Sequence, residues 1–167
     1  MITTIICDCD GVLSDGLKYV DKTGRRQLTA FHSRDSVACE ALVKIGIQVI
    51  VITHSDSPAI SEYWQRHSAS VMYTKQDKGN VLRKAGINFN SAIGIGDDTT
   101  DMGFLMECEK AFCPNDAHPI LLAKSGKFSK LQRLTCNGGA GVLSEIHYLI
   151  TNNLIEWNTK SIFGENS

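Results

Sequence analysis

The strongest constraint on the fold comes from the N-terminal residues of the chain. An isoleucine- and threonine-rich run, Ile2 to Ile6, is followed by two carboxylates and a glycine, Asp8, Asp10 and Gly11. Such a run predicts a buried strand that delivers acids to its carboxyl end, which is where open α/β sheets bind ligands. On an ideal strand both aspartates face the same side, and like charges so close need a cation or a proton between them. We therefore expect a metal site and a carboxylate nucleophile here.

Strand and helix patterns alternate along the rest of the chain. This order predicts an α/β fold, a Rossmann-like doubly wound parallel sheet covered by helices on both faces. The turn chemistry of residues 21–24 predicts a β-hairpin flap over residues 16–31. The length predicts one domain, over residues 1–153, and a C-terminal tail over 154–167, which Trp157 and Phe163 could anchor. Further strands are expected at 47–52, 71–73, 92–95 and 111–113, and helices at 35–45, from 57, and at 77–84, 101–108, 117–123 and 141–150.

Charge and composition exclude several classes of function. The formal net charge of −1 gives no electrostatic case for binding nucleic acid or an anionic membrane surface. No apolar run approaches the roughly 20 residues that cross a bilayer, and the N-terminus lacks a signal-peptide pattern. The six cysteines form no CxxC pair, so reduced thiols are expected instead of disulfides or zinc ligands. These features predict a cytoplasmic protein.

Polar groups follow four of the predicted strands. Each group alone has an ordinary structural explanation, such as a cap or a solvated side chain. Together they are hard to explain in this way, because all of them fall at the same edge of one sheet. The groups are Asp8 and Asp10, Thr53, Lys78, and the acids Asp97, Asp98 and Asp101.

These residue types suit phosphoryl transfer. Mg²⁺ takes hard oxygen ligands, and Asp8 and Asp97 can supply carboxylates. Asp8 can act as a nucleophile that forms an aspartyl-phosphate, and Asp10 can protonate the leaving group and then activate water. Lys78 and the hydroxyl of Thr53 can hold the phosphoryl oxygens on which charge develops. We therefore expect an enzyme that hydrolyses phosphate esters with Mg²⁺.

Residues 8–13, Thr53, Lys78 and residues 96–101 resemble the four motifs of the haloacid dehalogenase superfamily of phosphatases. The resemblance implies that Asp8 is the nucleophile and Asp10 the general acid and base, with Thr53 and Lys78 binding phosphate. It implies that Mg²⁺ is held by Asp8, the backbone carbonyl of Asp10, and Asp97. Asp98 or Asp101 would support the metal ligands or orient Lys78.

A closer resemblance, over about residues 2–150, is to the capless branch of this superfamily. This branch includes octulosonate 8-phosphate and nonulosonate phosphatases and the phosphatase-like domain fused to some CMP-sialic acid synthetases. The resemblance implies that the chain has no cap domain and that its substrate is a small-molecule sugar phosphate, a phosphorylated 2-keto-3-deoxy sugar acid. It also implies a homotetramer in which hairpins pack together and neighbours cover the active sites. The apolar set offered for this packing is Leu17, Tyr19, Leu28 and Phe31. The residues that carry the closer resemblance are the hairpin and segments 31–36, 115–119 and 136–141.

The chain departs from this branch near the predicted site. His54 and Ser55 stand where the octulosonate enzymes usually carry Gly-Arg, and Ser144 stands where they typically have arginine. Arg34 is then the remaining cation best placed to meet a sugar carboxylate, and His54 is expected to face the substrate. The glycine-rich loop of residues 138–141 fits a phosphate nest, a covering loop that reaches a neighbour, or a plain turn.

Two other classes of function compete with an active phosphatase. Receiver domains also combine acids, a threonine, a lysine and Mg²⁺, but they place the phosphorylated aspartate in the middle of the chain, whereas Asp8 is near its start. A catalytically weak phosphatase-like scaffold or oligomerisation module in sugar-acid biosynthesis is the main alternative. Intact Asp8 and Asp10 argue against it, and turnover of a phosphate ester would decide.

Overall fold

Six strands form one parallel sheet in the computed structural model, which describes residues 2–125 and 130–155. The apolar runs form these strands because helices cover both faces of the sheet, so β1 and β6 are buried along their whole length. The fold class predicted from the sequence is therefore correct. The strands are β1 (Thr4–Cys7), β4 (Gln48–Thr53), β5 (Ser70–Tyr73), β6 (Ala92–Ile95), β7 (Lys110–Cys113) and β8 (Leu131–Arg133).

The strand order places the two acidic segments next to each other. The order is β5-β4-β1-β6-β7-β8, with β1 at the centre between β4 and β6. Cys7, the last residue of β1, pairs with Val51 of β4 and with Ile95 of β6. The chain winds outwards from β1 in both directions, so the sheet has its topological switch point between β1 and β6. The residues that follow these two strands consequently share one crevice.

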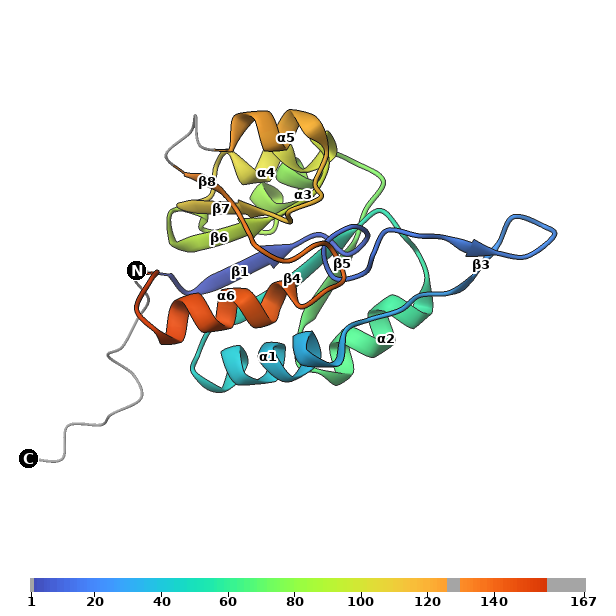
Figure 1. Cartoon of the computed structure of the whole chain (residues 1–167), viewed down its shortest axis with the longest axis horizontal. Helices are drawn as coiled ribbons and strands as arrows, with labels where there is room; N and C mark the ends of the chain where they lie inside the picture. Colours follow the sequence, from blue (N-terminus) through green and yellow to red (C-terminus); the bar gives the residue numbers. More distant parts are fainter. Residues whose placement is uncertain (1, 126–129, 156–167) are drawn as a thin grey trace, which may run out of the picture.

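Helices lie on both faces of the sheet, as Figure 1 shows. One core layer joins α1, α2 and α6 to the face that carries Ile5 and Val51, and the opposite layer joins α3, α4 and α5 to the face that carries Ile6 and Ile52. Alternate residues of each strand therefore feed opposite cores. The helices are α1 (Ser33–Lys44), α2 (Pro58–Arg66), α3 (Lys78–Lys84), α4 (Met102–Leu105), α5 (Pro119–Lys124) and α6 (Val142–Thr151), with 3₁₀ turns at Phe89–Ser91 and Thr99–Asp101.

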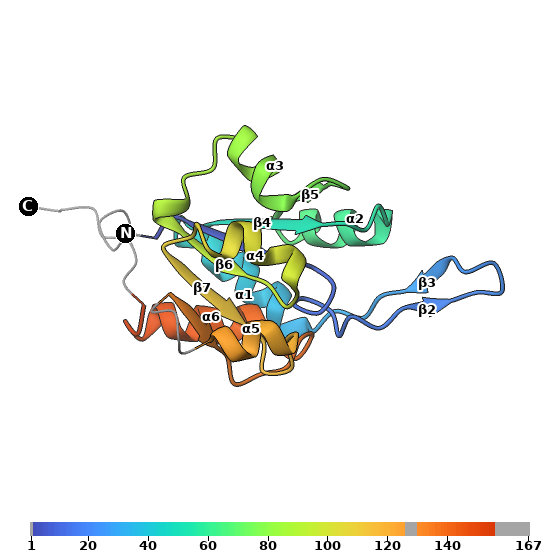
Figure 2. The same ribbon diagram turned by 90° about the horizontal axis from the view of Figure 1, so that it is seen from above.

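The predicted hairpin is present but has shorter strands than the sequence suggested. It consists of β2 (Tyr19–Val20) and β3 (Arg26–Leu28), and Figure 2 shows that it projects from the body of the molecule. The carboxylate of Asp21 stabilises its turn by accepting hydrogen bonds from the backbone N–H groups of Thr23 and Arg25. No cap domain interrupts the described residues, because the hairpin fills one possible insertion point and α2 with β5 fills the other.

One residue of the predicted hairpin surface packs elsewhere. Leu17, Tyr19 and Leu28 are exposed, as expected for a ribbon without a partner in its own chain. Phe31 instead stacks on Tyr63 at a ring distance of 4.6 Å and meets the edge of Trp64. Its assignment to the outward apolar set was therefore wrong, because the chain has already returned to the core where α1 begins.

Two further elements differ from the sequence prediction. The sequence analysis missed the edge strand β8, because only Leu131 of its three residues is buried and so short a segment has no recognisable strand pattern. The helix expected at 101–108 is instead a 3₁₀ turn, which begins at the capping box of Asp98 and Asp101, followed by the short α4.

The C-terminal segment bends back onto the body before the described part ends. Ile155, which the sequence placed in the tail, is buried in the core layer of α6. Trp157 and Phe163 lie outside the described residues. Within the described part of the chain, no helix is long and apolar enough to cross a bilayer.

Candidate active site

The carboxyl ends of the central strands open into a cavity of about 270 Å³. Asp8 follows β1, and its backbone N–H donates to the carbonyl of Ile95 at the end of β6 (3.0 Å). Thr53 ends β4, and Lys78 begins α3 because Asp77 caps that helix by accepting from the N–H of Asn80. The cavity is lined by Asp8, Asp10, Lys18, Thr53, His54, Lys78, Asp97, Asp98 and Thr100.

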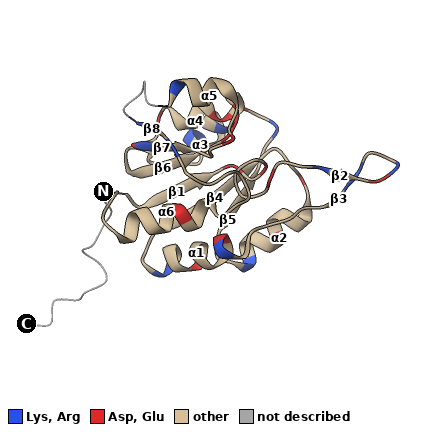
Figure 3. Cartoon of the chain, viewed as in Figure 1, with Lys and Arg blue, Asp and Glu red and all other residues tan. Residues whose placement is uncertain are grey.

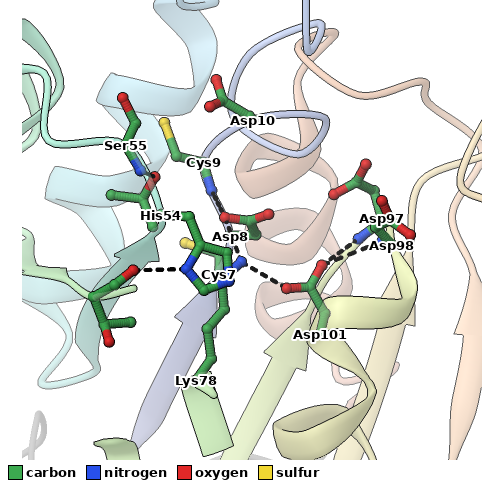
Figure 4. Close-up of polar contacts among 12 residues, drawn as sticks. Cys7, Asp8, Cys9, Asp10, His54, Ser55, Lys78, Asp97, Asp98 and Asp101 are labelled. Atoms are coloured by element: carbon green, nitrogen blue, oxygen red, sulfur yellow. Dashed lines mark hydrogen bonds and ion pairs between the residues drawn. The ribbon is translucent and has the colours of Figure 1, made fainter. Parts of the chain in front are cut away.

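Lys78 is a buried cation between two carboxylates. Its side chain is only 1% exposed, and its Nζ lies 2.8 Å from Oδ1 of Asp8 and 2.7 Å from Oδ1 of Asp101 (Figure 4). Burial lowers the pKa of Lys78, but the carboxylates of Asp101 and Asp8 outweigh it and raise this pKa above its ordinary value. Lys78 therefore stays charged beside Asp8, where it can attract an anionic group.

Asp101 holds this lysine in place and organises the neighbouring loop. It is fully buried, and its Oδ2 accepts hydrogen bonds from the backbone N–H groups of Asp97 (3.0 Å) and Asp98 (3.2 Å). Of the two supporting roles that the sequence left open, the orientation of Lys78 matches the position of Asp101. Asp98 instead accepts from the N–H and the hydroxyl of Thr99, so its side chain caps the turn.

Asp97 has a carboxylate oxygen with no partner. Its Oδ1 is buried and makes no hydrogen bond with the described residues. Burial, together with the charges of Asp101 and Asp8, raises the pKa of Asp97 to about 8. Gly11 has a φ of +85° and lies against this side chain, since a Cβ there would stand 2.1 Å from Oδ2 of Asp97. The nearby charge of Lys78 lowers the pKa of Asp97 but does not offset burial and the neighbouring carboxylates, so the net charge around this carboxylate is unfavourable to its ionised form.

These acids fit a divalent cation. Oxygen atoms of Asp8, Asp97 and Asp101 lie within 4.8 Å of one another, and burial raises the pKa of Asp8 to about 7. Both oxygens of Asp101 are already engaged by Lys78 and backbone N–H groups. Asp8 and Asp97 are therefore the side chains available to an ion, and few carboxylates with hard oxygens suit Mg²⁺. Asp8, Lys78, Asp97 and Asp101 are called the acid–lysine cluster below.

Asp10 points away from this cluster and has a cation of its own. Its Oδ1 lies 2.7 Å from a terminal nitrogen of Arg26, and its Oδ2 accepts from the other terminal nitrogen at 3.0 Å. The hydroxyl of Ser14 also donates to Oδ1 (3.2 Å). Figure 4 shows the carboxylate of Asp10 above Asp8, on the side away from Asp101. The two aspartates thus have separate electrostatic partners.

Thr53 and His54 close another side of the cavity. The hydroxyl oxygen of Thr53 accepts from the backbone N–H of Ser55 (3.0 Å), which leaves its proton free to donate to a ligand. His54 lines the cavity, as predicted, and its Nδ1 is 2.6 Å from the carbonyl oxygen of Thr74. Because a carbonyl only accepts, this nitrogen must carry a proton, and Nε2 is the atom left for a ligand.

Two other predicted contacts lie outside the cavity. Arg34, at the start of α1, lines a separate cavity beside Val37 and His147, because α1 packs against α6. The glycine loop does not form a phosphate nest with the N–H groups of Gly138 and Gly139. Gly138 donates to Asp116, and Gly139 donates to the carbonyl of Val12 (2.8 Å), so the loop braces the turn after β1.

Sequence reasoning missed the hairpin cations. A second cavity of about 200 Å³ adjoins the first and is lined by Asp10, Lys18, Arg26, His54 and Ser55. Lys18 and Arg26 come from the hairpin, where two adjacent arginines, Arg25 and Arg26, were the only signal in the sequence. Nothing in that pattern says which of them turns inwards, since this depends on the twist of the ribbon.

Comparison with known proteins places the chain in a family. No family model matches it. The 3-deoxy-D-manno-octulosonate 8-phosphate phosphatase KdsC of Yersinia pestis is 30% identical over 154 residues, which cover 89% of this chain and 79% of that protein. The cobalt-bound octulosonate 8-phosphate phosphatase of Haemophilus influenzae superposes with a TM-score of 0.79 at 27% identity, covering 91% of this chain and 85% of that one. A Legionella pneumophila structure described as a HAD-superfamily (subfamily III A) hydrolase gives 0.78 at 29% identity, covering 90% and 82%.

The fold, the acid–lysine cluster and these relatives define a phosphatase of the haloacid dehalogenase superfamily. Within it, the chain belongs to the family of KdsC-like phosphatases. The resemblance first noted in the motifs of the sequence is thereby confirmed for the fold and for the class of enzyme. The roles of individual residues in this chain remain predictions.

Proposed function

We propose that this protein is a Mg²⁺-dependent phosphomonoesterase that hydrolyses a phosphorylated 2-keto-3-deoxy sugar acid through an aspartyl-phosphate on Asp8. The observation that carries the proposal is the arrangement of Asp8 between a buried lysine and the partnerless carboxylate oxygen of Asp97. A carboxylate held beside a fixed cation and a cation-binding acid is suited to receive a phosphoryl group. The six cysteines are free thiols, five of them buried, which is consistent with an enzyme that functions in the reducing cytoplasm.

In the first step, Asp8 attacks phosphorus. Its Oδ1 is engaged by Lys78 and by the N–H of Cys9 (2.6 Å), so Oδ2 is the oxygen left to form the new O–P bond. The ester P–O bond breaks, and Asp10 gives its proton to the leaving oxygen. Lys78, with the hydroxyl of Thr53, holds the phosphoryl oxygens as charge develops on them.

In the second step, water attacks phosphorus and the Asp8 O–P bond breaks, which returns the carboxylate. Asp10, now ionised, takes the proton from that water and is ready for the next cycle. Mg²⁺ held by Asp8, Asp97 and the backbone carbonyl of Asp10 would neutralise the charge that otherwise separates the nucleophile from the phosphate. Asp101 and Asp98 act through the lysine and the loop, without touching phosphate.

The substrate class is supported by relatives and by the charges of the cavity. The curated relatives are named for 3-deoxy-D-manno-octulosonate 8-phosphate, an acidic sugar phosphate. The second cavity adjoins the first and is lined by the hairpin cation Lys18 beside His54, while the other hairpin cation, Arg26, is paired with Asp10. Octulosonate 8-phosphate and nonulosonate 9-phosphate types both fit this description. Arg34 is not part of it, because its side chain lines another cavity.

We further propose that the protein is a homotetramer whose neighbouring subunits cover the active sites. A phosphatase must shield the reacting phosphoryl group from bulk water, and this chain places no cap over its cavity in the described residues. The hairpin exposes Leu17, Tyr19, Val20 and Leu28, and a two-stranded ribbon is marginal on its own. Packing of these residues against other subunits would both cover the cavity and bury the apolar surface of the hairpin.

A panel of phosphate esters tests the function directly. The panel holds octulosonate 8-phosphate, a nonulosonate 9-phosphate, a neutral hexose 6-phosphate and p-nitrophenyl phosphate, each with Mg²⁺ and with excess chelator. We expect the highest kcat/KM for an acidic sugar phosphate and no turnover of any ester with chelator. Full activity in chelator would refute the metal dependence, and no turnover of any ester with Mg²⁺ would favour the scaffold alternative.

A further inference from the structure

The hairpin sends one side chain back into the active site. Arg26, the first residue of β3, belongs to a ribbon that projects from the body, and Figure 3 shows basic segments along it. The side chain of Arg26 is nevertheless only 12% exposed, whereas Tyr19 and Leu28 of the same ribbon are 49% and 67% exposed. A buried guanidinium on an otherwise solvated ribbon needs a partner.

That partner is the carboxylate of Asp10. Nη1 of Arg26 donates a hydrogen bond to Oδ2 of Asp10 (3.0 Å), and Nη2 makes an ion-pair contact with Oδ1 (2.7 Å) without hydrogen-bond geometry. This hydrogen bonding raises the pKa of Arg26 above its ordinary value. Because a planar guanidinium thus contacts both oxygens of Asp10, it restrains the plane of the carboxylate as well as its position, which the single ammonium of a lysine could not do.

The turn after β1 leaves Asp10 dependent on such a partner. Asp8 is tied by Lys78 and by the N–H of Cys9, but neither group reaches the carboxylate of Asp10. Among the described residues, only Arg26 and Ser14 hold the Asp10 side chain, and Ser14 contacts one oxygen. Loss of Arg26 would therefore free the Asp10 carboxylate to rotate.

We propose that Arg26 is the positioning residue for Asp10, so that the hairpin, and not the sheet, aims the proton donor of the reaction. The proposal rests on the proposed function, because it assumes that Asp10 protonates the leaving oxygen. Displacement of a catalytic group by about 1 Å can cost about 10²-fold in rate. Arg26 does not touch substrate in this account and acts only through Asp10.

The test uses the dependence on the leaving group. An alkoxide leaving group needs a proton from Asp10, whereas p-nitrophenolate leaves well without one, and kcat/KM reports the step in which the leaving group departs. We expect Arg26→Gln to lower kcat/KM about 10- to 100-fold for a sugar phosphate and less than about threefold for p-nitrophenyl phosphate. Arg26→Lys keeps the charge without the planar contact to both oxygens, and it should give an intermediate loss for the sugar phosphate alone.

Arg25→Gln is the matched control, since Arg25 is the adjacent exposed arginine of the same ribbon. It should leave both esters unaffected. Equal losses of Arg26→Gln on both esters would overturn the proposal in favour of a structural role, and so would unchanged activity on the sugar phosphate. A loss on an acidic sugar phosphate that exceeds the loss on a neutral one would instead assign Arg26 to the substrate carboxylate and would also overturn it.

Failure of this proposal is distinguishable from failure of the proposed function. Wild-type turnover of both esters with Mg²⁺, and its loss in chelator, test the function without any change at Arg26. If those results hold while Arg26→Gln behaves as wild type, only the positioning role is wrong.

Discussion

The two halves of the active site are built in different ways. The acid–lysine cluster lies at the ends of buried strands, where Asp8 and Lys78 are 7% and 1% exposed and every contact comes from the same sheet edge. The hairpin half is a thin ribbon with exposed apolar residues, and its contribution to the cavity is limited to Lys18 and Arg26. A single chain thus fixes the proposed nucleophile, Asp8, within its own core, whereas the proposed proton donor, Asp10, contacts an element that this core barely supports.

The largest expected effect is on turnover at the sheet edge. Asp8→Asn keeps the shape of the side chain but removes the nucleophilic oxygen, so kcat/KM should fall by roughly 10⁴-fold or more. Steady-state kinetics on the best ester of the panel measures it, with the urea unfolding midpoint as the control for folding. Turnover near that of the wild type would mean that the sheet edge does not supply the nucleophile.

The second effect is on stability. Lys78→Met leaves the buried carboxylates of Asp8 and Asp101 without their cation, and breaking such a buried pair costs about 3–5 kcal/mol of the free energy of unfolding. Lys75→Met is the control, because Lys75 is exposed on the loop before α3, and its change should stay within about 0.5 kcal/mol. Urea denaturation in chelator compares the two. Similar values for both would show that the cluster is not the tightly coupled unit described above.

The third prediction concerns pH. The raised pKa of Asp97, about 8 against an ordinary value of 3.8, means that the folded protein without metal holds a proton that the unfolded chain releases. The stability of the metal-free protein should therefore be greatest below pH 4 as far as this group is concerned, and should fall as the pH rises towards 8.

Urea denaturation in chelator across this range measures the effect of Asp97. Asp97→Asn should flatten the decline, because an amide does not titrate. Added Mg²⁺ should stabilise the wild type more than Asp97→Asn at pH 8. If the free energy of unfolding falls with pH equally steeply in both proteins, Asp97 does not hold the extra proton, and its proposed role in the metal site is contradicted.

The smallest effect is expected at the exposed apolar surface of the hairpin. Tyr19→Asp places a charge on the exposed ribbon, and it should both reduce the assembled mass in light scattering and lower turnover several-fold by leaving the sites uncovered. Tyr148→Asp, at a similarly exposed tyrosine of α6, is the matched control and should change neither. A fully active wild-type monomer at assay concentration would contradict the proposed tetramer. Unchanged mass and turnover in Tyr19→Asp would contradict the role of the hairpin in it.

The same contrast explains what the sequence could predict. The central strands β1, β4 and β6 were readable because runs such as Val49 to Ile52 are buried on both faces, and their ends fix where Asp8, Thr53 and Asp97 fall. The acid–lysine cluster followed from the rule that parallel strands bring their carboxyl ends to one edge.

The other part of the site depends on the directions in which individual side chains point, and the hydrophobic periodicity of a sequence does not predict these directions. Arg26 and Arg34 both follow the first acidic segment in the sequence, and nothing in the pattern distinguishes them. In the structure, Arg34 on α1 lines a separate cavity, whereas Arg26 on the hairpin turns inwards and contacts Asp10. Phe31 returned to the core for a similar reason, since the stack with Tyr63 is set by the packing of α2. The sequence therefore predicted the half of the site built on the sheet and missed the half supplied by the hairpin.

The central claim is that Asp8 becomes covalently phosphorylated during turnover. The most direct measurement is rapid acid quenching of the enzyme with Mg²⁺ and its best ester, followed by mass spectrometry of the peptide that contains residues 8–13. In the wild type this peptide should gain the mass of one phosphoryl group at Asp8, and the label should disappear as substrate is exhausted. In Asp8→Asn the peptide should never acquire the label. Steady turnover with no phosphorylated peptide at any quench time, or a label on another residue that persists in Asp8→Asn, would contradict it.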